Sequence, residues 1–471
     1  MKALVSLMIH VMMLDKEEIN MFQEGFLWGG AVTAHQSEGA YTACGKSPAV
    51  CDLFPKPEHS DFKDGIDSFH RYDEDFALFE EMGFTSYRFS IDWSRVCPDG
   101  EHFSEEAMQF YDDFINSMIK HGMEPMCSLY HFEMPQVLME KYNGFYSRKV
   151  VDLFVNFANK MIDRYGDRVK KWISFNEQNS IGLIGSKKIA YGAVCPEGMD
   201  EQLFINQLVH NTFVAHAKVV EKVHTIKDAI VLGMVIYIPH YAATCNPLDE
   251  LEARNQMAVT DMYFEMFTYG EYSSYMLAKM KNENKMPEML PGDLELLKNN
   301  TCDWLSLSYY FSTVASYGKL SMDMNGNAKA AVNPYLKASE WGWQIDPLSL
   351  RIGLRDIYAR YRLPVMVVEN GFGMRDQLVN GTVIDDDRIN YMRDHIEQIS
   401  KAIDEGVDCR GYLMWGPIDI LSSQGEMGKR YGTIYVNRDD KDLKDMKRYK
   451  KKSFYWYKKV IETNGKDISN D

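Results

Sequence analysis

Two glutamates lie at the ends of apolar runs, and each has an asparagine neighbour. Glu177 closes the run WISFNE, and Glu369 closes the run VMVVEN. Two carboxyl groups facing each other across a pocket can cleave a glycosidic bond, because one protonates the leaving oxygen while the other attacks the sugar or activates water. A guanidinium such as that of Arg88 near one carboxylate would keep it ionised, as a nucleophile must be. The other carboxyl group must hold a proton near neutral pH.

The segments that must position these carboxylates alternate between apolar runs and amphipathic helical patterns. Near-continuous apolar strands are typical of a parallel sheet that is buried on both faces. Eight runs are strand candidates, seven of them separated by helices, and they read FLWGGAVTAH, SYRFSIDW, MEPMCSLYHF, VKKWISFNE, IVLGMVIYI, DWLSLSYY, PVMVVENG and RGYLMWGP. This pattern predicts a single-domain α/β fold, a closed (β/α)8 TIM barrel.

The helix boundaries are predicted from residues that start helices. Ser147 is expected to cap one helix, and Pro347 to occupy the first turn of another. Further helices are expected to begin near Glu201, Glu252 and Asp386. The basic C-terminal run KDLKDMKRYKKKSFYWYKK has apolar residues at helical spacing, which predicts a terminal helix with a solvated basic face.

Polar and aromatic residues gather where the predicted strands end, and this is the face of a (β/α)8 barrel that carries the chemistry. They are Gln36, Arg88, His131, Asn176 with Glu177, Tyr310, Glu369 with Asn370, and Trp415. The fifth run, residues 230–238, ends in no such residue. One polar strand end alone would be explained as capping of the barrel, but their joint occurrence indicates a site.

Composition and charge exclude several function classes. The 471 residues carry a formal net charge of −16, which argues against a nucleic-acid partner or an anionic membrane surface, though not against a small anionic ligand. No G-x-G-x-x-G follows a strand, and there is no P-loop. The eight cysteines form no C-x-x-C pair and are expected to be buried free thiols, so that no metal or organic cofactor is implied.

The N-terminal segment stands apart from this pattern. Its apolar run lacks a small-residue cleavage site and is too short to span a bilayer. Residues 1–20 are therefore expected to be an extension, disordered or upstream of a functional start at Met21, with the barrel over residues 21–471.

Six motifs in order give the chain a family resemblance from about Phe22 to its end. They are FLWGGAVTAHQSEGAY, YRFSIDWSRV, HFEMPQ, ISFNEQNS, VVENGFG and YGTIYV, and together they resemble glycoside hydrolase family 1, the β-glucosidase and phospho-β-glucosidase family. The resemblance implies that Glu177 in the N-E motif is the general acid/base. It implies that Glu369 in the E-N-G motif is the nucleophile, with retention through a covalent glycosyl-enzyme.

The same resemblance implies roles for the residues around the carboxylates. It places Gln36, His131 and Asn176 on the hydroxyls of the cleaved sugar, Arg88 and Tyr310 beside the nucleophile, Trp415 under the sugar ring, and Trp343 beneath the leaving group. Two positions depart from the pattern of many β-glucosidases. Ser308 replaces the Asn of N-Y-Y, and Gln178 replaces the Pro after the acid/base. Both variants resemble the phospho-β-glucosidases.

The loop SSQGEMGKRYG, residues 422–432, bears on substrate choice. It lacks the Glu-Trp pair of ordinary β-glucosidases, and the resemblance places Ser423, Lys429 and Tyr431 where phospho-specific relatives hold the phosphate. Hydroxyl and ammonium donors suit a near-dianionic phosphate, which a Glu there would repel. On spacing alone, Lys429-Arg430 is typical of a solvated charge pair, but the family register favours a phosphate site. Gln424 stands where phospho-β-galactosidases tend to carry Trp, which leans towards glucose and leaves the 4-hydroxyl preference open.

The sequence thus predicts a cytoplasmic, retaining 6-phospho-β-glucosidase whose partner is a small phosphorylated β-glucoside. An ordinary β-glucosidase and a 6-phospho-β-galactosidase stay open as alternatives, as does a homo-oligomeric state. A catalytically silent sugar-phosphate-binding protein is disfavoured because both glutamates are present. Another barrel enzyme, such as an aldolase, would need a catalytic Lys or a metal cluster at the strand ends.

Overall fold

The computed structural model describes residues 22–470 except 54–55, 184–189 and 319–331. The predicted extension at residues 1–20 lies outside the described residues. Eight parallel strands close into a barrel in the order β1-β10-β9-β7-β5-β4-β3-β2. They are β1 (Leu27–Ala31), β2 (Ser86–Ser90), β3 (Glu124–Ser128), β4 (Lys171–Ile173), β5 (Ile230–Ile236), β7 (Trp304–Ser308), β9 (Val365–Asn370) and β10 (Cys409–Trp415). Each falls within one of the eight predicted runs or overlaps it, so the predicted barrel is confirmed.

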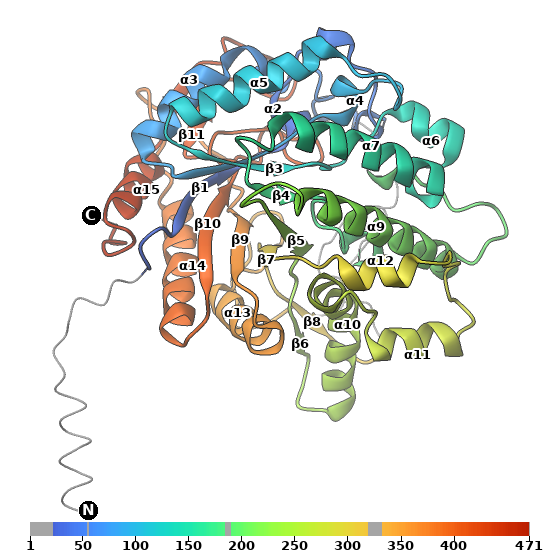
Figure 1. Cartoon of the computed structure of the whole chain (residues 1–471). Coiled ribbons are helices and arrows are strands. Elements are labelled where there is room, and N and C mark those ends of the chain that lie inside the picture. The colour runs from blue at the N-terminus through green and yellow to red at the C-terminus, as the bar shows by residue number, and fades with distance from the viewer. Residues whose placement is uncertain (1–21, 54–55, 184–189, 319–331, 471) are drawn as a thin grey trace, which may run out of the picture.

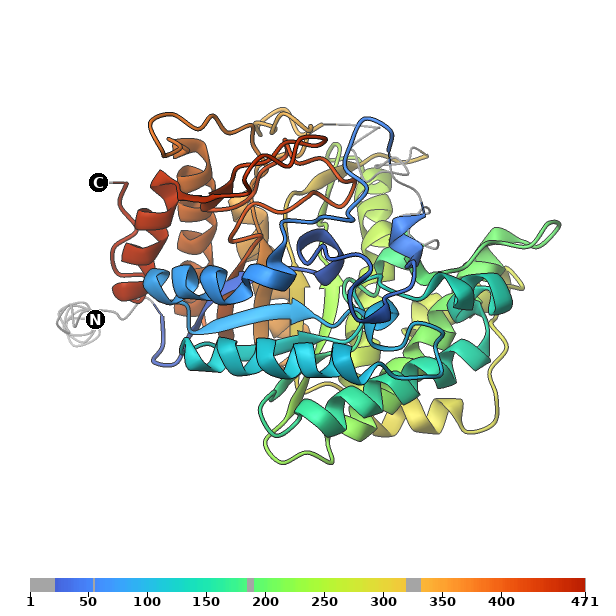
Figure 2. The ribbon, with the colours of Figure 1, turned by 90° about the horizontal axis from the view of Figure 1, so that it is seen from above.

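Helices surround the barrel on its outer side (Figure 1). The long ones are α3 (Ser68–Met82), α5 (Glu105–Lys120), α7 (Arg148–Tyr165), α9 (Glu201–Val223), α10 (Pro247–Tyr269), α13 (Pro347–Tyr361), α14 (Asp386–Asp404) and α15 (Lys452–Glu462). The C-terminal helix α15 packs against both α14 and α3, so the end of the chain closes the ring beside its first long helix (Figure 2).

Shorter elements decorate the connections between strands and helices. The short helices are α2 (Ala34–Ser37), α4 (Trp93–Val96), α6 (Gln136–Tyr142), α8 (Ser180–Leu183), α11 (Ser274–Asn282), α12 (Asp293–Asn299), η1 (Ala43–Gly45), η2 (Val50–Asp52) and η3 (Gly144–Tyr146). Parallel β6 (His240–Ala242) and β8 (Thr313–Ala315) form one small sheet. Antiparallel β11 (Ile434–Val436) and β12 (Arg448–Lys450) form the other.

Side-chain caps set the helix starts. Ser147 caps α7 by accepting a hydrogen bond from the Lys149 amide at 3.2 Å, as predicted. Pro347 occupies the first turn of α13, also as predicted. The predicted start near Glu252 is wrong, because Asn246 caps the helix and α10 begins at Pro247. Cap and proline together fix that boundary more strongly than the apolar periodicity that follows them.

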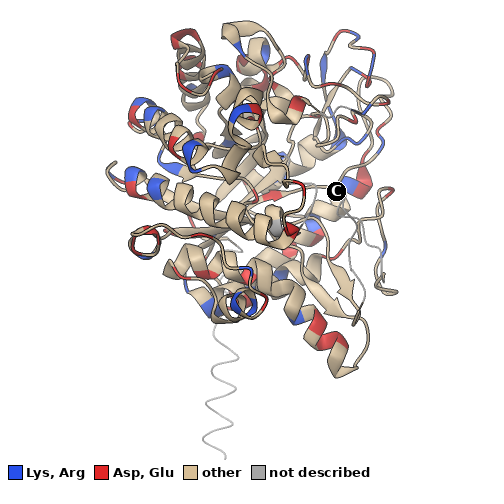
Figure 3. Ribbon diagram, turned by 90° about the vertical axis from the view of Figure 1, so that its right-hand side faces the viewer, with Lys and Arg blue, Asp and Glu red and all other residues tan. Residues whose placement is uncertain are grey.

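Lys and Arg residues alternate with Asp and Glu residues along the outer helices in the view of Figure 3. The terminal helix α15 buries Phe454, Tyr457 and Val460 against the barrel layer, which confirms the predicted helix with one apolar face. Within the described part of the chain, no helix is both long and apolar enough to cross a membrane.

Candidate active site

The segment that carries Glu177 is held between the neighbouring strands at the carboxyl end of β4. Glu177 itself has a left-handed backbone, with φ +42°, and its side chain is buried. The Gln178 amide donates to a β5 carbonyl at 3.1 Å. Asn179 exchanges two 2.8 Å hydrogen bonds with the backbone of Ile236. Strand five, which offers no predicted site residue, thus fixes the turn that presents Glu177.

Glu369 lies near the end of β9 with a donor on each carboxylate oxygen. The Arg88 guanidinium donates to Oε1 at 2.5 Å, and the Tyr310 hydroxyl donates to Oε2 at 2.8 Å. Arg88 is fully buried, and its other nitrogens donate to Ser128 at 2.9 Å and to Asn176 at 2.7 Å. The predicted neighbourhood of Arg88, Tyr310 and Glu369 is therefore present as one hydrogen-bonded unit.

The charge state of Glu369 reflects opposing influences. Burial is the largest, and it raises the pKa of Glu369 to about 7. The Arg88 charge and the hydrogen bonds from Tyr310 and Arg88 lower this pKa, whereas the nearby Glu177 carboxylate raises it. The guanidinium contact expected from the sequence is present, yet its effect on the pKa does not outweigh that of desolvation. Burial also raises the pKa of Tyr310 well above its usual range, so its hydroxyl stays a donor.

Strand β7 brings the two carboxylates to one place. Its last residue, Ser308, donates a hydrogen bond to Glu177 Oε1 at 2.7 Å. In the pairing with β9 the register shifts between Leu307 and Ser308, so that Ser308 pairs with Glu369. One strand end therefore contacts both carboxylates, since Tyr310 follows two residues later.

Gln36 lies on α2, which follows β1, His131 lies just beyond β3, and Trp415 is the last residue of β10; all three are buried. Gln36 donates to the Leu421 carbonyl at 2.6 Å and so holds the start of the 422–432 loop. The His131 and Trp415 rings are 5.8 Å apart between centroids. The His131 amide donates to Glu133 Oε2 at 2.9 Å.

Asn370, the last residue of β9, has a structural role. Its side-chain amide donates to the Tyr309 carbonyl at 2.7 Å, and its oxygen accepts from the Tyr412 hydroxyl at 2.9 Å. The Tyr391 hydroxyl lies 3.0 Å from the same amide nitrogen. These bonds engage both ends of the Asn370 amide within the protein and keep β9 in register beside Glu369.

Lys429 lies among aromatic rings that lead to the nucleophile. Its Nζ is 3.6 Å from the centroid of Trp343 and 5.7 Å from that of Tyr431. Trp343 is in turn 5.5 Å from Tyr310, whose hydroxyl binds Glu369. Burial lowers the pKa of Lys429 to about 8, and Glu426 acts in the opposite direction.

Two glycines of the VVENGFG motif make room for these groups, a role that the sequence reasoning missed. A Cβ on Gly373 would lie 2.8 Å from Lys429 Cγ and 3.3 Å from Tyr431 Cζ. A Cβ on Gly371 would lie 3.2 Å from the Trp415 carbonyl oxygen and 3.3 Å from Tyr431 Cδ1. The signal was the spacing of glycines directly after Glu369.

Ser423 lies at the exposed tip of the turn that opens the loop. Ser422 is buried, and its hydroxyl accepts the Glu426 amide at 3.1 Å. The Gln424 side chain, which leans towards glucose in the sequence comparison, accepts a hydrogen bond from Lys56. The structure thus groups Lys429 with Tyr431 and places Ser423 on the same loop at its solvent side.

The solvated charge pair that the Lys429-Arg430 spacing suggests is wrong for both residues, because both are buried. Arg430 donates to Asp419 at 2.8 Å and to the backbone carbonyls of Val436 and Arg438 at 2.9 and 2.6 Å. Lys451 lies 2.6 Å from the other oxygen of Asp419. This buried cluster fixes the backbone on either side of Lys429.

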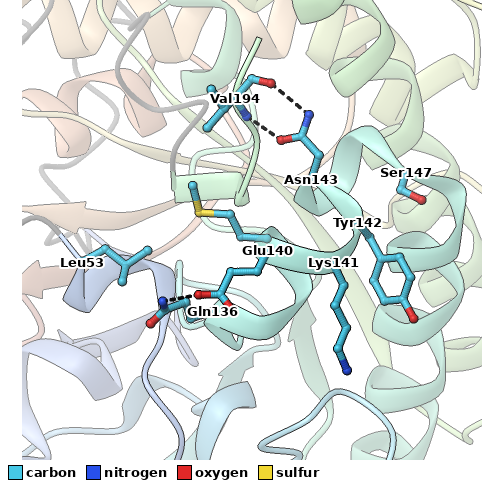
Figure 4. Close-up of a pocket in the computed structure, with 9 residues that line it drawn as sticks. Leu53, Gln136, Glu140, Lys141, Tyr142, Asn143, Ser147 and Val194 are labelled. Carbon is cyan, nitrogen blue, oxygen red and sulfur yellow. Dashed lines mark hydrogen bonds between the residues drawn. The ribbon is translucent and has the colours of Figure 1, made fainter. Parts of the chain in front are cut away.

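A cavity of about 720 Å³ lies over α6, apart from the residues described so far (Figure 4). Its lining includes Tyr142 and Lys141 but none of the predicted site residues. Its polar groups pair with one another, for example Asn143 with the Val194 backbone at 2.7 and 2.9 Å. Within the described ranges, no group of three or more His, Cys, Asp or Glu side chains is placed to hold a metal ion.

Comparisons with known proteins agree with this arrangement. The model of glycosyl hydrolase family 1 matches residues 18–466. The chain is 42% identical to the aryl-phospho-β-D-glucosidase BglH of Bacillus subtilis, covering 95% of this chain and 98% of that protein. It is 40% identical to a 6-phospho-β-glucosidase of Clostridium longisporum, with the same coverage. The solved β-glucosidase from Thermotoga maritima in complex with glucoimidazole matches with a TM-score of 0.83 at 28% identity, covering 95% of this chain and all of that one.

Proposed function

Because the chain belongs to glycosyl hydrolase family 1, we propose that it hydrolyses 6-phospho-β-D-glucosides to glucose 6-phosphate and an aglycone. Relatives that cover nearly the whole chain carry the names aryl-phospho-β-D-glucosidase and 6-phospho-β-glucosidase, which supports this substrate class. The buried, hydrogen-bonded pair Glu177 and Glu369 supports catalysis by two carboxyl groups.

The surroundings of Lys429 carry the proposal. Its ammonium is buried and faces the rings of Trp343 and Tyr431 rather than a carboxylate. The nearby carboxylate of Glu426 is engaged by Trp341 Nε1 and by Arg375, each at 3.1 Å. The Lys429 ammonium is desolvated, and the rings of Trp343 and Tyr310 lie between it and Glu369. Such an ammonium could bind an anionic substituent on the sugar.

Lys429 and Tyr431 would hold the 6-phosphate through an ammonium and a hydroxyl donor, with Ser423 closing on it from the turn. A phosphate dianion would offset the desolvation of Lys429, whereas a neutral hydroxymethyl group would leave these donors without strong acceptors. Because Trp343 and Tyr310 link Lys429 to Glu369, a sugar anchored by its phosphate is held in contact with the nucleophile.

The reaction proceeds in two displacements. Glu369 attacks the anomeric carbon while the bond to the aglycone oxygen breaks, and Glu177 gives its proton to that oxygen. Water then adds to the anomeric carbon and gives a proton to Glu177, and the bond to Glu369 breaks. Arg88 and Tyr310 hold Glu369 and spread its charge before attack and after release.

The remaining strand-end residues would orient the sugar. Gln36, His131 and Asn176 would supply donors and acceptors for its hydroxyls, and Trp415 would offer a ring face beneath it. Trp343 would support the leaving group in addition to its contact with Lys429. A phosphorylated sugar substrate would also support a cytoplasmic location, since phosphorylating import delivers such sugars there.

An ordinary β-glucosidase is the second candidate, since the solved relative at 28% identity bears that name. The two are separated by kcat/KM on p-nitrophenyl β-D-glucoside 6-phosphate and on the same glucoside without phosphate. A preference of at least about 30-fold for the phosphorylated substrate is expected, because a buried charged contact contributes about 2–5 kcal/mol. Equal kcat/KM on both glucosides would contradict the phosphate proposal. If neither is cleaved but p-nitrophenyl β-D-galactoside 6-phosphate is, the substrate is the galactose epimer.

A further inference from the structure

Ser308 holds one oxygen of Glu177 and has no role in the reaction as derived above. It is the last residue of β7, it is fully buried, and its hydroxyl donates to Glu177 Oε1 at 2.7 Å. The sequence marks the same position, because Ser308 replaces the asparagine of the N-Y-Y motif. Ser306, two residues earlier and equally buried, donates instead to the Gly233 carbonyl at 3.1 Å. Of these two buried serines on β7, Ser308 bonds a carboxylate and Ser306 bonds the backbone.

The two carboxylates differ in how their oxygens are engaged. Both oxygens of Glu369 accept hydrogen bonds, from Arg88 and from Tyr310. Glu177 accepts the Ser308 hydrogen bond on Oε1. The Ser308 hydroxyl donates to Oε1, and this hydrogen bond is strongest when Oε1 carries no proton. When Glu177 is protonated, its proton is therefore favoured on Oε2.

We infer that Ser308 is a positioning residue that keeps Glu177 Oε1 as the acceptor and leaves Oε2 to carry the catalytic proton. This inference rests on the proposed function, since it assigns an atom within the proposed acid/base step. In the first displacement the proton moves from Oε2 to the aglycone oxygen, which keeps the electron pair of the broken bond. In the second, Oε2 takes a proton from the attacking water. The Ser308 hydroxyl keeps its own proton throughout.

The register shift beside Ser308 fixes the position of its hydroxyl relative to Glu369. Since Ser308 pairs with Glu369 across β7 and β9, the hydroxyl that holds the acid is fixed relative to the nucleophile by main-chain pairing. Glu177 itself has a left-handed backbone conformation, which persists only where the surrounding structure holds it. The Ser308 contact therefore ties the orientation of the acid to the strand pair that carries the nucleophile.

The test compares Ser308→Ala with Ser306→Ala as a matched control on the same strand. The substrates are phenyl and 2,4-dinitrophenyl β-D-glucoside 6-phosphate, whose leaving groups do and do not need protonation. Ser308→Ala is expected to lower kcat/KM about tenfold on the phenyl substrate and less than about twofold on the dinitrophenyl substrate. The alkaline limb of its pH profile should move to higher pH, because the carboxylate form loses a stabilising donor. Ser306→Ala should behave as wild type in both respects.

Ser308→Thr, which keeps the hydroxyl, should restore most of the activity on the phenyl substrate. Equal losses on both leaving groups with an unmoved pH profile would overturn the inference and leave Ser308 a purely structural residue. Wild-type rates for Ser308→Ala would overturn it as well. If the wild type cleaves only unphosphorylated aryl glucosides, the phosphate proposal fails while the same leaving-group comparison on those substrates still decides the role of Ser308.

Discussion

Lys429 and Arg430 are neighbours in the sequence, carry the same charge and are both buried, yet their surroundings differ completely. The Arg430 guanidinium is bonded to Asp419 and to two backbone carbonyls and lies 4.0 Å from the centroid of Tyr435. The Lys429 ammonium faces the ring of Trp343 at 3.6 Å. Burial beside a carboxylate and carbonyl acceptors is the mark of a structural cation, whereas burial against aromatic rings leaves a cation able to bind an anion.

The comparison also shows how one residue supports the other. Arg430 exchanges backbone hydrogen bonds with Met374 at 3.0 and 3.1 Å, just beyond the VVENGFG motif. Arg388 donates to the Arg430 carbonyl at 2.9 Å. These bonds hold the main chain next to Lys429 against the segment that follows Glu369.

The largest loss of activity is expected on replacing the nucleophile Glu369, and this loss should not depend on either Lys429 or Arg430. Glu369→Gln should lower kcat at least about 1000-fold on phosphorylated and plain aryl glucosides alike, because the nucleophile is lost while the fold stays intact. Steady-state rates and thermal unfolding of the purified variant measure both outcomes. Substantial residual activity on either substrate would refute the assignment of Glu369 as the nucleophile.

The two neighbouring cations should respond in opposite ways to the same replacement. Lys429→Met should lower kcat/KM on p-nitrophenyl β-D-glucoside 6-phosphate about 100-fold, and far less on the plain glucoside, with little change in stability. Arg430→Met should instead lower the free energy of unfolding by about 3 kcal/mol, because it removes one cation from a buried ionic cluster.

Urea unfolding of both variants beside their kinetics separates these effects. The contrast fails if Lys429→Met unfolds as readily as Arg430→Met. It also fails if Arg430→Met keeps wild-type stability and loses only the phosphorylated substrate, since Arg430 would then be a phosphate ligand itself.

The smallest effect is expected from pH. Glu369 acts as a carboxylate and has a pKa of about 7, so kcat/KM should rise with pH through that value on both substrates. Lys429 binds phosphate as an ammonium and has a pKa of about 8, so kcat/KM on the phosphorylated substrate should fall as pH rises above 8. The loss should be about tenfold per pH unit there, beyond any fall seen with the plain glucoside. If kcat/KM falls at the same pH and with the same slope on both substrates, Lys429 does not bind the phosphate.

The fold was largely predictable because barrel strands are short apolar runs and the helices between them keep one apolar face. The strand ends could be located for the same reason, and Arg88, Tyr310 and Glu369 proved to share one hydrogen-bonded unit. The start of α10 was misplaced because the boundary depends on the Asn246 cap and on Pro247 rather than on periodicity. These are local properties, which a sequence displays along its length.

What the sequence determined by itself was the barrel, the two glutamates and the family to which their motifs belong. The environment of each charge could be seen only in the folded chain: Arg430 is paired, Lys429 faces rings, and Ser308 bonds Glu177. The Lys429–Trp343 and Ser308–Glu177 contacts join residues far apart in the sequence, and the Arg430–Asp419 pair depends on how a loop folds back on itself, so residue type does not report any of them. The pKa of Glu369 is of the same kind, because it is set by desolvation and by groups from three different strands.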